Sequence, residues 1–130
     1  MSATAREIVS TPDAPAAIGP YSQAVRHGGL LFCSGALPLV PESGELDDAS
    51  PAAETARCLR NLDAICRAQG TTLAEAVKLT VYTTTLDQFA EINAAYAEFF
   101  PAAPPARVTI GVAALPKGAR VEIDAIVPVD

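Results

Sequence analysis

The chain has 130 residues and a mass of 13.4 kDa. We interpret residues 1–130 as a single domain that buries roughly two-thirds of its unfolded surface. Half of the residues are hydrophobic, 18% are charged and the net charge is −6, which argues against intrinsic disorder, a nucleic-acid partner and attraction to an anionic membrane. So little charge on a small chain indicates that part of its surface is covered in an oligomer.

Cysteine usage and hydropathy indicate the compartment. The three cysteines, Cys33, Cys58 and Cys66, are odd in number and lack CxxC spacing. No apolar signal-peptide core follows the first residues, and no apolar run approaches the ~20 residues of a membrane span. The simplest interpretation is a soluble cytoplasmic protein with reduced thiols and no membrane partner.

Three short strands are predicted in the N-terminal third, at residues 7–9, 22–25 and 30–33. His27-Gly28-Gly29 suits a tight hairpin turn between the second and third strands. Ser34-Gly35 ends the third strand, and a polar loop follows at residues 38–48. Residues 10–21 contain three prolines and a glycine, which predicts a loop of fixed shape because proline removes backbone freedom.

A first helix is predicted from Ser50-Pro51, which combines an N-cap hydroxyl with a proline at the first helical position. Apolar residues follow at helical spacing, with Cys58 and Cys66 on the apolar side, and Gly70 is a natural stop. Residues 71–76 fit either a loop or a turn.

A fourth strand and a second helix follow. The strand is predicted at residues 77–84, which are rich in β-branched side chains. Residues 85–88 fit a capping box that would start the helix. Pro101 would end it, and the residues that repeat at helical intervals between these limits are Phe89, Ile92, Tyr96 and Phe99.

The last quarter predicts two strands, at residues 107–112 and 120–127, joined by a turn at 115–118. The resulting order, β-β-β-α-β-α-β-β, predicts an α+β fold with a six-stranded mixed sheet and both helices on one face. The other face has no cover within the chain, so we expect another subunit to cover it.

Each of these last strands carries a charged residue that a sheet interior would not favour: Arg107 heads the first, and Glu122 lies inside the second. They fit an ion pair between neighbouring strands or two edge charges. Alternatively, Arg107 binds a substrate carboxylate through its planar guanidinium, and Glu122 holds a water or transfers a proton.

The other polar residues give weaker evidence for a catalytic or metal site. Tyr21 fits either a polar tip on a rigid loop or ordinary packing, and Asn93 fits a solvated or capping amide beside the apolar helix face. The single histidine, His27, sits beside the Gly-Gly turn, and no ligand spacing for a metal is present. Cys33 lacks a nearby base for nucleophilic chemistry, and no phosphate-binding glycine loop occurs. No metal or cofactor is therefore expected.

Five stretches resemble the Rid family of reactive intermediate deaminases (RidA-type, YjgF-like). They follow the family order along nearly the whole chain. The stretches are Ala14-Pro15-Ala16-Ala17-Ile18-Gly19-Pro20-Tyr21-Ser22-Gln23-Ala24, Ser34-Gly35, Asn93-Ala94-Ala95-Tyr96-Ala97-Glu98-Phe99-Phe100, Pro105-Ala106-Arg107 and Leu115-Pro116-Lys117-Gly118-Ala119-Arg120-Val121-Glu122-Ile123-Asp124-Ala125-Ile126.

This resemblance implies a chorismate-mutase-like fold and a homotrimer, in which the sheets form a central barrel and three clefts lie between subunits. It also implies 2-iminobutanoate/2-iminopropanoate deaminase activity. Such enzymes hydrolyse the enamine and imine intermediates that pyridoxal-phosphate enzymes release, giving 2-oxo acids and ammonia and sparing those enzymes from damage. The implied ligands are small 2-imino and 2-oxo acids.

The family's functional residues have counterparts here. Arg107 matches the arginine that binds the substrate carboxylate, Glu122 the glutamate associated with the hydrolytic water, and Tyr21 the tyrosine that lines the cleft. Ser34-Gly35 matches the strand end near the substrate, and Asn93 matches the helix asparagine at the edge of the pocket.

Two positions depart from the pattern. Thr109 stands where the best-known members carry a cysteine, and the loop at residues 101–106 looks shorter than in the family. Both lie beside the implied pocket, so Thr109 is counted as a substrate-binding candidate, and its hydroxyl suits a more polar imino acid. The alternatives left open are a non-catalytic, carboxylate-binding regulatory trimer, an RNA-acting protein, which the net charge disfavours, and a chorismate mutase.

Overall fold

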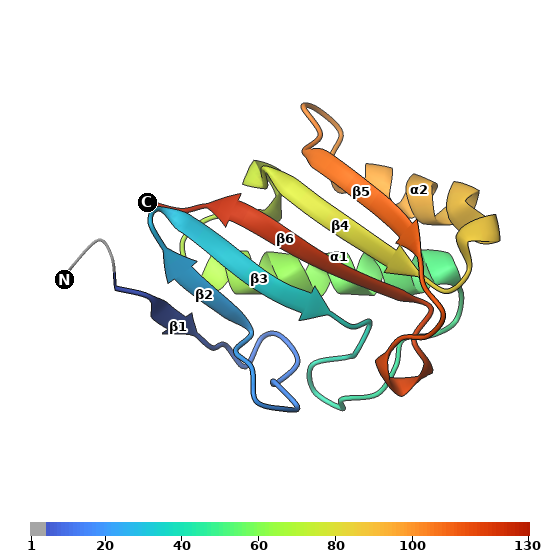
Figure 1. Ribbon diagram of the computed structural model, residues 1–130, viewed down its shortest axis with the longest axis horizontal. Coiled ribbons are helices and arrows are strands. Elements are labelled where there is room, and N and C mark those ends of the chain that lie inside the picture. The colour runs from blue at the N-terminus through green and yellow to red at the C-terminus, as the bar shows by residue number, and fades with distance from the viewer. Residues whose placement is uncertain (1–4) are drawn as a thin grey trace.

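The computed structural model describes residues 5–130 and contains the six strands and two helices in the predicted order (Figure 1). The strands are β1 (Glu7–Val9), β2 (Ala24–His27), β3 (Leu30–Ala36), β4 (Lys78–Thr83), β5 (Ala106–Gly111) and β6 (Val121–Pro128). The helices are α1 (Pro51–Ala68) and α2 (Phe89–Ala97), and short 3-10 turns lie at Leu73–Glu75, Leu86–Gln88 and Pro116–Gly118. The α+β prediction is confirmed.

All strands join one sheet in the order β1-β2-β3-β6-β4-β5. β4 and β5 pair in parallel, and the other neighbours pair antiparallel. A parallel pair needs a crossover, which α2 supplies between these two strands. The prediction of an ion pair between neighbouring strands is wrong, because β4 separates the strand of Arg107 from the strand of Glu122.

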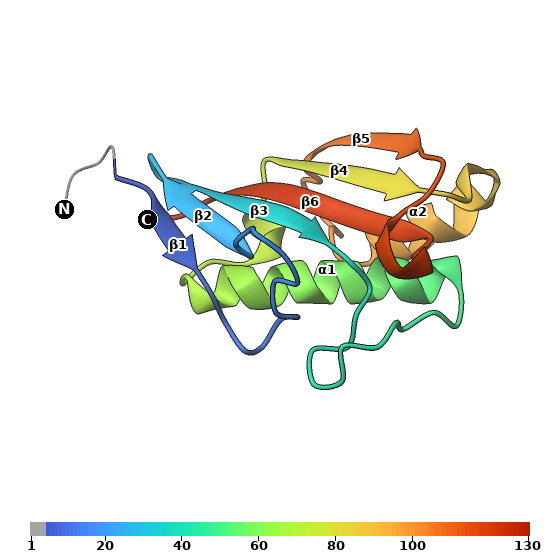
Figure 2. The same cartoon turned by 60° about the horizontal axis from the view of Figure 1, so that its bottom comes forward.

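Both helices cover the same face of the sheet, as predicted (Figure 2). The sequence alternates accordingly along β6, where Val121, Ile123, Ala125 and Val127 are buried and the residues between them are half-buried on the other face. We call this other face the open face. Its exposed large apolar side chains include Ile8, Phe32, Val108 and Ile110, with exposed fractions of 59%, 42%, 41% and 40%.

The first helix begins as its sequence predicts. Ser50 Oγ accepts a hydrogen bond from the Ala53 amide at 3.0 Å, and Pro51 occupies the first turn. Cys58 and Cys66 are buried against the sheet, and Gly70 follows the helix with φ of 80°, a conformation that favours glycine.

The strand boundaries differ from the predictions by up to three residues, and β3 continues through Ser34-Gly35 to Ala36 where these two residues were predicted to end it. Three departures have a visible cause. β2 begins at Ala24 because the Gln23 side chain binds the preceding loop, accepting from the Thr11 amide at 2.7 Å and donating to the Pro15 carbonyl at 2.8 Å. The capping box is absent, since the Thr85 carbonyl and not its hydroxyl accepts from the Gln88 amide. The second helix ends at Ala97, ahead of Pro101, in a pair of turns.

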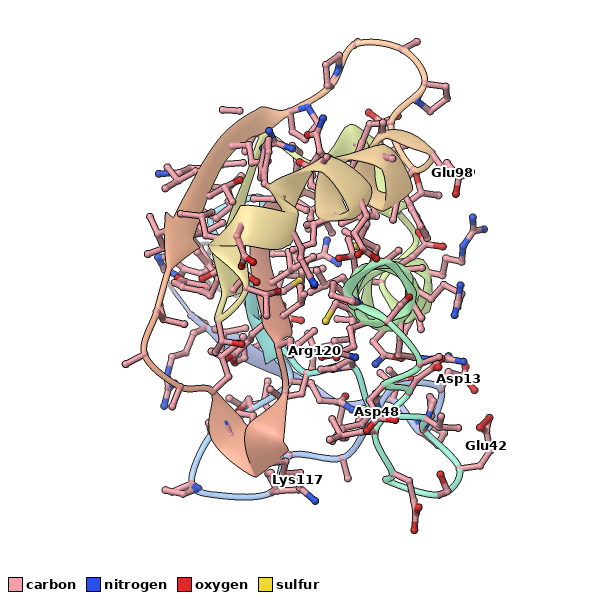
Figure 3. The ribbon with its side chains drawn as sticks, turned by 90° about the vertical axis from the view of Figure 1, so that its right-hand side faces the viewer. Asp13, Glu42, Asp48, Glu98, Lys117 and Arg120 are labelled. Atoms are coloured by element: carbon pink, nitrogen blue, oxygen red, sulfur yellow. The ribbon has the colours of Figure 1, made fainter. Side chains whose placement is uncertain are left out.

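A buried carboxylate fixes the chain just before β6. Glu54 is fully buried in α1, and it accepts hydrogen bonds from the backbone amide of Arg120 at 2.7 Å and from the guanidinium of Arg120 at 2.5 Å. Arg120 also donates to the Asp48 carbonyl at 2.7 Å. Arg120 and Asp48 lie side by side in Figure 3. One ion pair therefore ties α1, the loop before it and the start of β6.

We expect Glu54→Ala to lower the free energy of unfolding by about 3 kcal/mol, because the substitution leaves a guanidinium and a backbone amide without their acceptor. Denaturant unfolding at neutral pH measures this loss. Glu75→Ala, at an exposed position of a 3-10 turn, is the control. A loss below about 1 kcal/mol, the range of a surface pair, would contradict the assignment.

Candidate active site

Arg107 lies on the helix-covered face of edge strand β5, since it pairs in register with the buried Leu79. Its Nη1 donates to Asn93 Oδ1 of α2 at 2.8 Å. Its guanidinium carbon lies 4.7 Å from the centre of the Tyr96 ring and 5.4 Å from that of Phe89. These contacts hold the guanidinium in place, and no carboxylate of residues 5–130 forms an ion pair with it.

Arg107, Asn93 and Tyr96 line a pocket that the loop after α2 closes with Pro104 and Pro105. Thr109 follows Arg107 on the same face of β5. The Thr109 Oγ1 and the Tyr96 hydroxyl are buried and find no hydrogen-bond partner among the described residues. We call Arg107, Asn93 and Thr109 the arginine half-site, which offers a fixed cation to an anionic ligand.

Glu122 lies on the open face, half-buried, and its carboxyl packs directly over Gly35 of β3. A Cβ on Gly35 would lie 2.9 Å from the carboxyl carbon of Glu122, so any larger residue there would force this carboxyl to move. Burial and, secondarily, the charge of Asp124 raise the pKa of Glu122 above its ordinary value. The raised pKa suits a group that exchanges protons.

Ser34, Gly35 and Tyr21 line one pocket together with Asn61 and Ile65 of α1, and of these Gly35 lies against the Glu122 carboxyl. The register of β3 on β6 shifts between Cys33 and Ala36, which releases Ser34-Gly35 from regular pairing. Ser34 Oγ donates to the Ser22 carbonyl at 2.6 Å, and the Tyr21 hydroxyl accepts from the Ile18 amide at 3.3 Å. We call Glu122, Tyr21, Ser34 and Gly35 the glutamate half-site.

A single chain does not bring the two half-sites together. Arg107 and Glu122 lie on opposite faces of the sheet, with β4 between their strands. Within one chain Arg107 and Glu122 therefore do not share a site, because strand order and side-chain alternation separate them. The clefts between subunits that the family resemblance implies stay a prediction. Any site that uses both needs two copies of the chain.

The cysteines and the histidine offer no alternative chemistry. A hydrogen bond to Cys66, together with burial, raises the pKa of the Cys33 thiol, and burial raises the pKa of the Cys58 thiol, so neither supplies a thiolate. His27 is exposed beside Gly28 and Gly29, whose φ angles of 60° and 79° form the predicted hairpin turn. Within residues 5–130 no group of three His, Cys, Asp or Glu side chains is arranged to hold a metal ion, and no helix there is long and apolar enough to cross a membrane.

Sequence reasoning missed two polar neighbours of Glu122. Tyr82 of β4 lies opposite Glu122, and Asp124 follows Glu122 on the same face of β6. The alternation of Glu122 and Asp124 with buried apolar residues was the available signal. Phe89 and Tyr96 were expected only as part of the apolar helix face, yet they also hold Arg107.

Comparison with known proteins decides the family. Residues 11–129 match the family described as Endoribonuclease L-PSP. The chain belongs to this family, which includes the Rid proteins. The Rid resemblance drawn from the motifs is thereby confirmed.

Individual members of the Rid family match over nearly their full length. The chain is 52% identical over 121 residues to the RutC family protein y4sK of Sinorhizobium fredii, covering 93% of this chain and 96% of that protein. It is 44% identical over 126 residues to the 2-iminobutanoate/2-iminopropanoate deaminase of Bos taurus, covering 97% of this chain and 92% of that protein. The crystal structure of E. coli TdcF with bound serine superposes with a TM-score of 0.90 at 38% identity, covering 95% and 99%.

Proposed function

We propose that this Rid protein hydrolyses small 2-imino acids, such as 2-iminobutanoate and 2-iminopropanoate, to 2-oxo acids and ammonia. The observation that carries the proposal is the preformed arginine half-site, in which Asn93 and two aromatic rings hold a guanidinium that has no carboxylate partner among residues 5–130. A bidentate carboxylate is the ligand that such a planar fork prefers. Relatives named as deaminases support the reaction.

The active assembly in this proposal is a homotrimer, in which each cleft joins the arginine half-site of one subunit to the glutamate half-site of the next. The exposed apolar side chains on the open face support burial of that face in an assembly. The position of Arg107 on an edge strand supports its reaching a neighbouring subunit. A molar mass of three chains in solution is the expected result, and a monomer at working concentration would refute the shared cleft.

The chemistry follows from these groups. Arg107 orients the substrate by its carboxylate, and the protonated imine is already electrophilic at carbon. Glu122 accepts a proton from water as the oxygen–carbon bond forms, which gives a carbinolamine. Glu122 then returns the proton to nitrogen. As the carbon–nitrogen bond breaks, the hydroxyl oxygen forms the carbonyl and gives its proton to the Glu122 carboxylate, so that ammonia and a 2-oxo acid are released and the proton passes on to ammonia as ammonium. In the cell this reaction would remove intermediates that pyridoxal-phosphate enzymes release.

The test couples the protein to a threonine or serine dehydratase in the presence of semicarbazide, which traps free imine. Active protein diverts imine from the trap, so semicarbazone formation falls and 2-oxo acid formation accelerates with protein concentration. Undiminished semicarbazone formation at high protein concentration would refute the activity. If 2-oxo acids still protected the assembly thermally through Arg107, the protein would be a carboxylate-binding regulator, for which Thr109 in place of the family cysteine is the motivating departure.

A further inference from the structure

Two side chains that the proposed mechanism does not use lie beside Glu122 on the open face. Tyr82 is the register partner of Glu122 on β4, and Asp124 follows on β6. The Tyr82 hydroxyl donates a hydrogen bond to Asp124 Oδ2 at 2.8 Å, which ties the two strands diagonally. The carboxylate of Asp124 is thus fixed next to Glu122.

Asp124 is the charged neighbour of Glu122 on this face. β3 presents the neutral Phe32, Ser34 and Gly35 there, and β5 presents the apolar Val108 and Ile110. The remaining titratable groups of the described open face are Tyr82, Lys78, which pairs with Ile126 beyond Asp124, and His27 at the far end of β2. Tyr21 of the glutamate half-site is the titratable group on the loop before β2. In the proposed trimer, Arg107 of the adjacent copy would face Glu122 as well.

We propose that Asp124, held by Tyr82, is a positioning residue for Glu122 that keeps a negative charge beside it, so that Glu122 retains the proton needed by the departing nitrogen. The inference rests on the proposed function. Asp124 and Tyr82 act through Glu122 and need not touch the substrate. The step they assist is the breaking of the carbon–nitrogen bond. In this step the proton taken from water passes from Glu122 to nitrogen, the hydroxyl gives its proton to the freed Glu122 carboxylate as the carbonyl forms, and ammonia leaves.

The electrostatic reason is the repulsion between two carboxylates. When Glu122 ionises next to Asp124, the two negative charges repel, so the protonated form of Glu122 is favoured. The hydrogen bond from Tyr82 fixes the position of the Asp124 carboxyl beside Glu122. The charge of Asp124 accordingly adds to burial in raising the pKa of Glu122. A general acid works best when its pKa lies close to the operating pH, because enough of it then carries the proton.

The test measures the ionisation of Glu122 in the intact assembly labelled with ¹³C-glutamate, with its carboxyl signal assigned by Glu122→Gln. Asp124→Asn, which keeps shape and removes charge, is expected to lower the pKa of Glu122 and to move the corresponding limb of the kcat profile for imine hydrolysis to lower pH. Asp130→Asn removes the same charge from the C-terminus, about 26 Å along the chain from Glu122 at the usual rise of an extended chain. Asp130→Asn should leave both the pKa of Glu122 and the kcat profile unchanged.

Tyr82→Phe tests the second half of the proposal in a double-mutant cycle. In the parent protein this variant should lower the pKa of Glu122, because Asp124 is no longer held beside it. In the Asp124→Asn background it should not change the pKa of Glu122 further, since Tyr82 acts only through Asp124. An unchanged Glu122 titration in Asp124→Asn would overturn the inference. The NMR titration needs no turnover, so a wild-type protein without imine hydrolysis but with this shift would refute the proposed function alone.

Discussion

Arg107→Ala is expected to reduce kcat/KM for imine hydrolysis by roughly 10²-fold or more, because the substrate loses a charge-assisted, bidentate contact that fixes its orientation. Arg107→Lys keeps the charge but loses the planar fork, so it should recover only part of the activity. Initial rates of 2-oxo acid formation against imine concentration, with semicarbazide as competitor, measure both variants.

The same substitution should change stability little, and this separates a binding role from a structural one. Arg107 is exposed and has no ion pair with a carboxylate of residues 5–130, so its loss leaves no buried charge behind. Thermal unfolding of Arg107→Ala is therefore expected to resemble that of the parent. Full activity in Arg107→Ala, or a collapse of its fold, would show that Arg107 is not a substrate anchor.

Glu122→Gln is expected to reduce kcat by about 10²- to 10⁴-fold, the range that general acid–base groups contribute. The amide keeps the size of the carboxyl over Gly35 but cannot accept the proton of water or return it to nitrogen. KM should change much less, because Arg107 still binds the carboxylate. The measurement is a pH–rate profile of the parent and the variant, with Glu75→Gln at an exposed position as the matched control.

The stability of Glu122→Gln should move in the opposite direction from its activity. The pKa of Glu122 is raised in the folded protein, so the native state binds its proton more tightly than the unfolded state does. Because of this difference in proton binding, the parent loses stability as pH rises from the ordinary glutamate pKa to the raised value. Glutamine does not titrate, so the variant lacks this loss. At neutral pH the variant should be at least as stable as the parent. Lower stability together with normal kcat would show that Glu122 serves the fold and not the reaction.

Local sequence patterns were sufficient for most elements. Ser50-Pro51 marks the start of α1 because capping involves only neighbouring residues. The alternation in β6 identifies its buried face because a strand repeats every two residues. The strand boundary at Ala24 was mispredicted because the Gln23 side chain binds Thr11 and Pro15 outside its own element.

The candidate residues Arg107, Glu122, Tyr21, Ser34-Gly35 and Asn93 were all recognisable from the sequence, chiefly through their motifs. Which of these residues lie together in the fold was not recognisable from the sequence. Arg107 joins Asn93 because the crossover helix α2 packs over β5, and Glu122 joins Gly35 because β3 pairs with β6. These contacts link residues far apart in the chain, which local periodicity does not encode.

The sequence by itself determined the fold class, the family and the residues with chemical potential, since these depend on composition, local periodicity and motif order. Only the tertiary structure decided that β4 lies between β5 and β6, which places Arg107 and Glu122 on opposite faces of one sheet. It also set Asp124 and Tyr82 beside Glu122. The physical reason is that strand order and register arise from pairing between distant segments, and that pairing settles which side chains share a face.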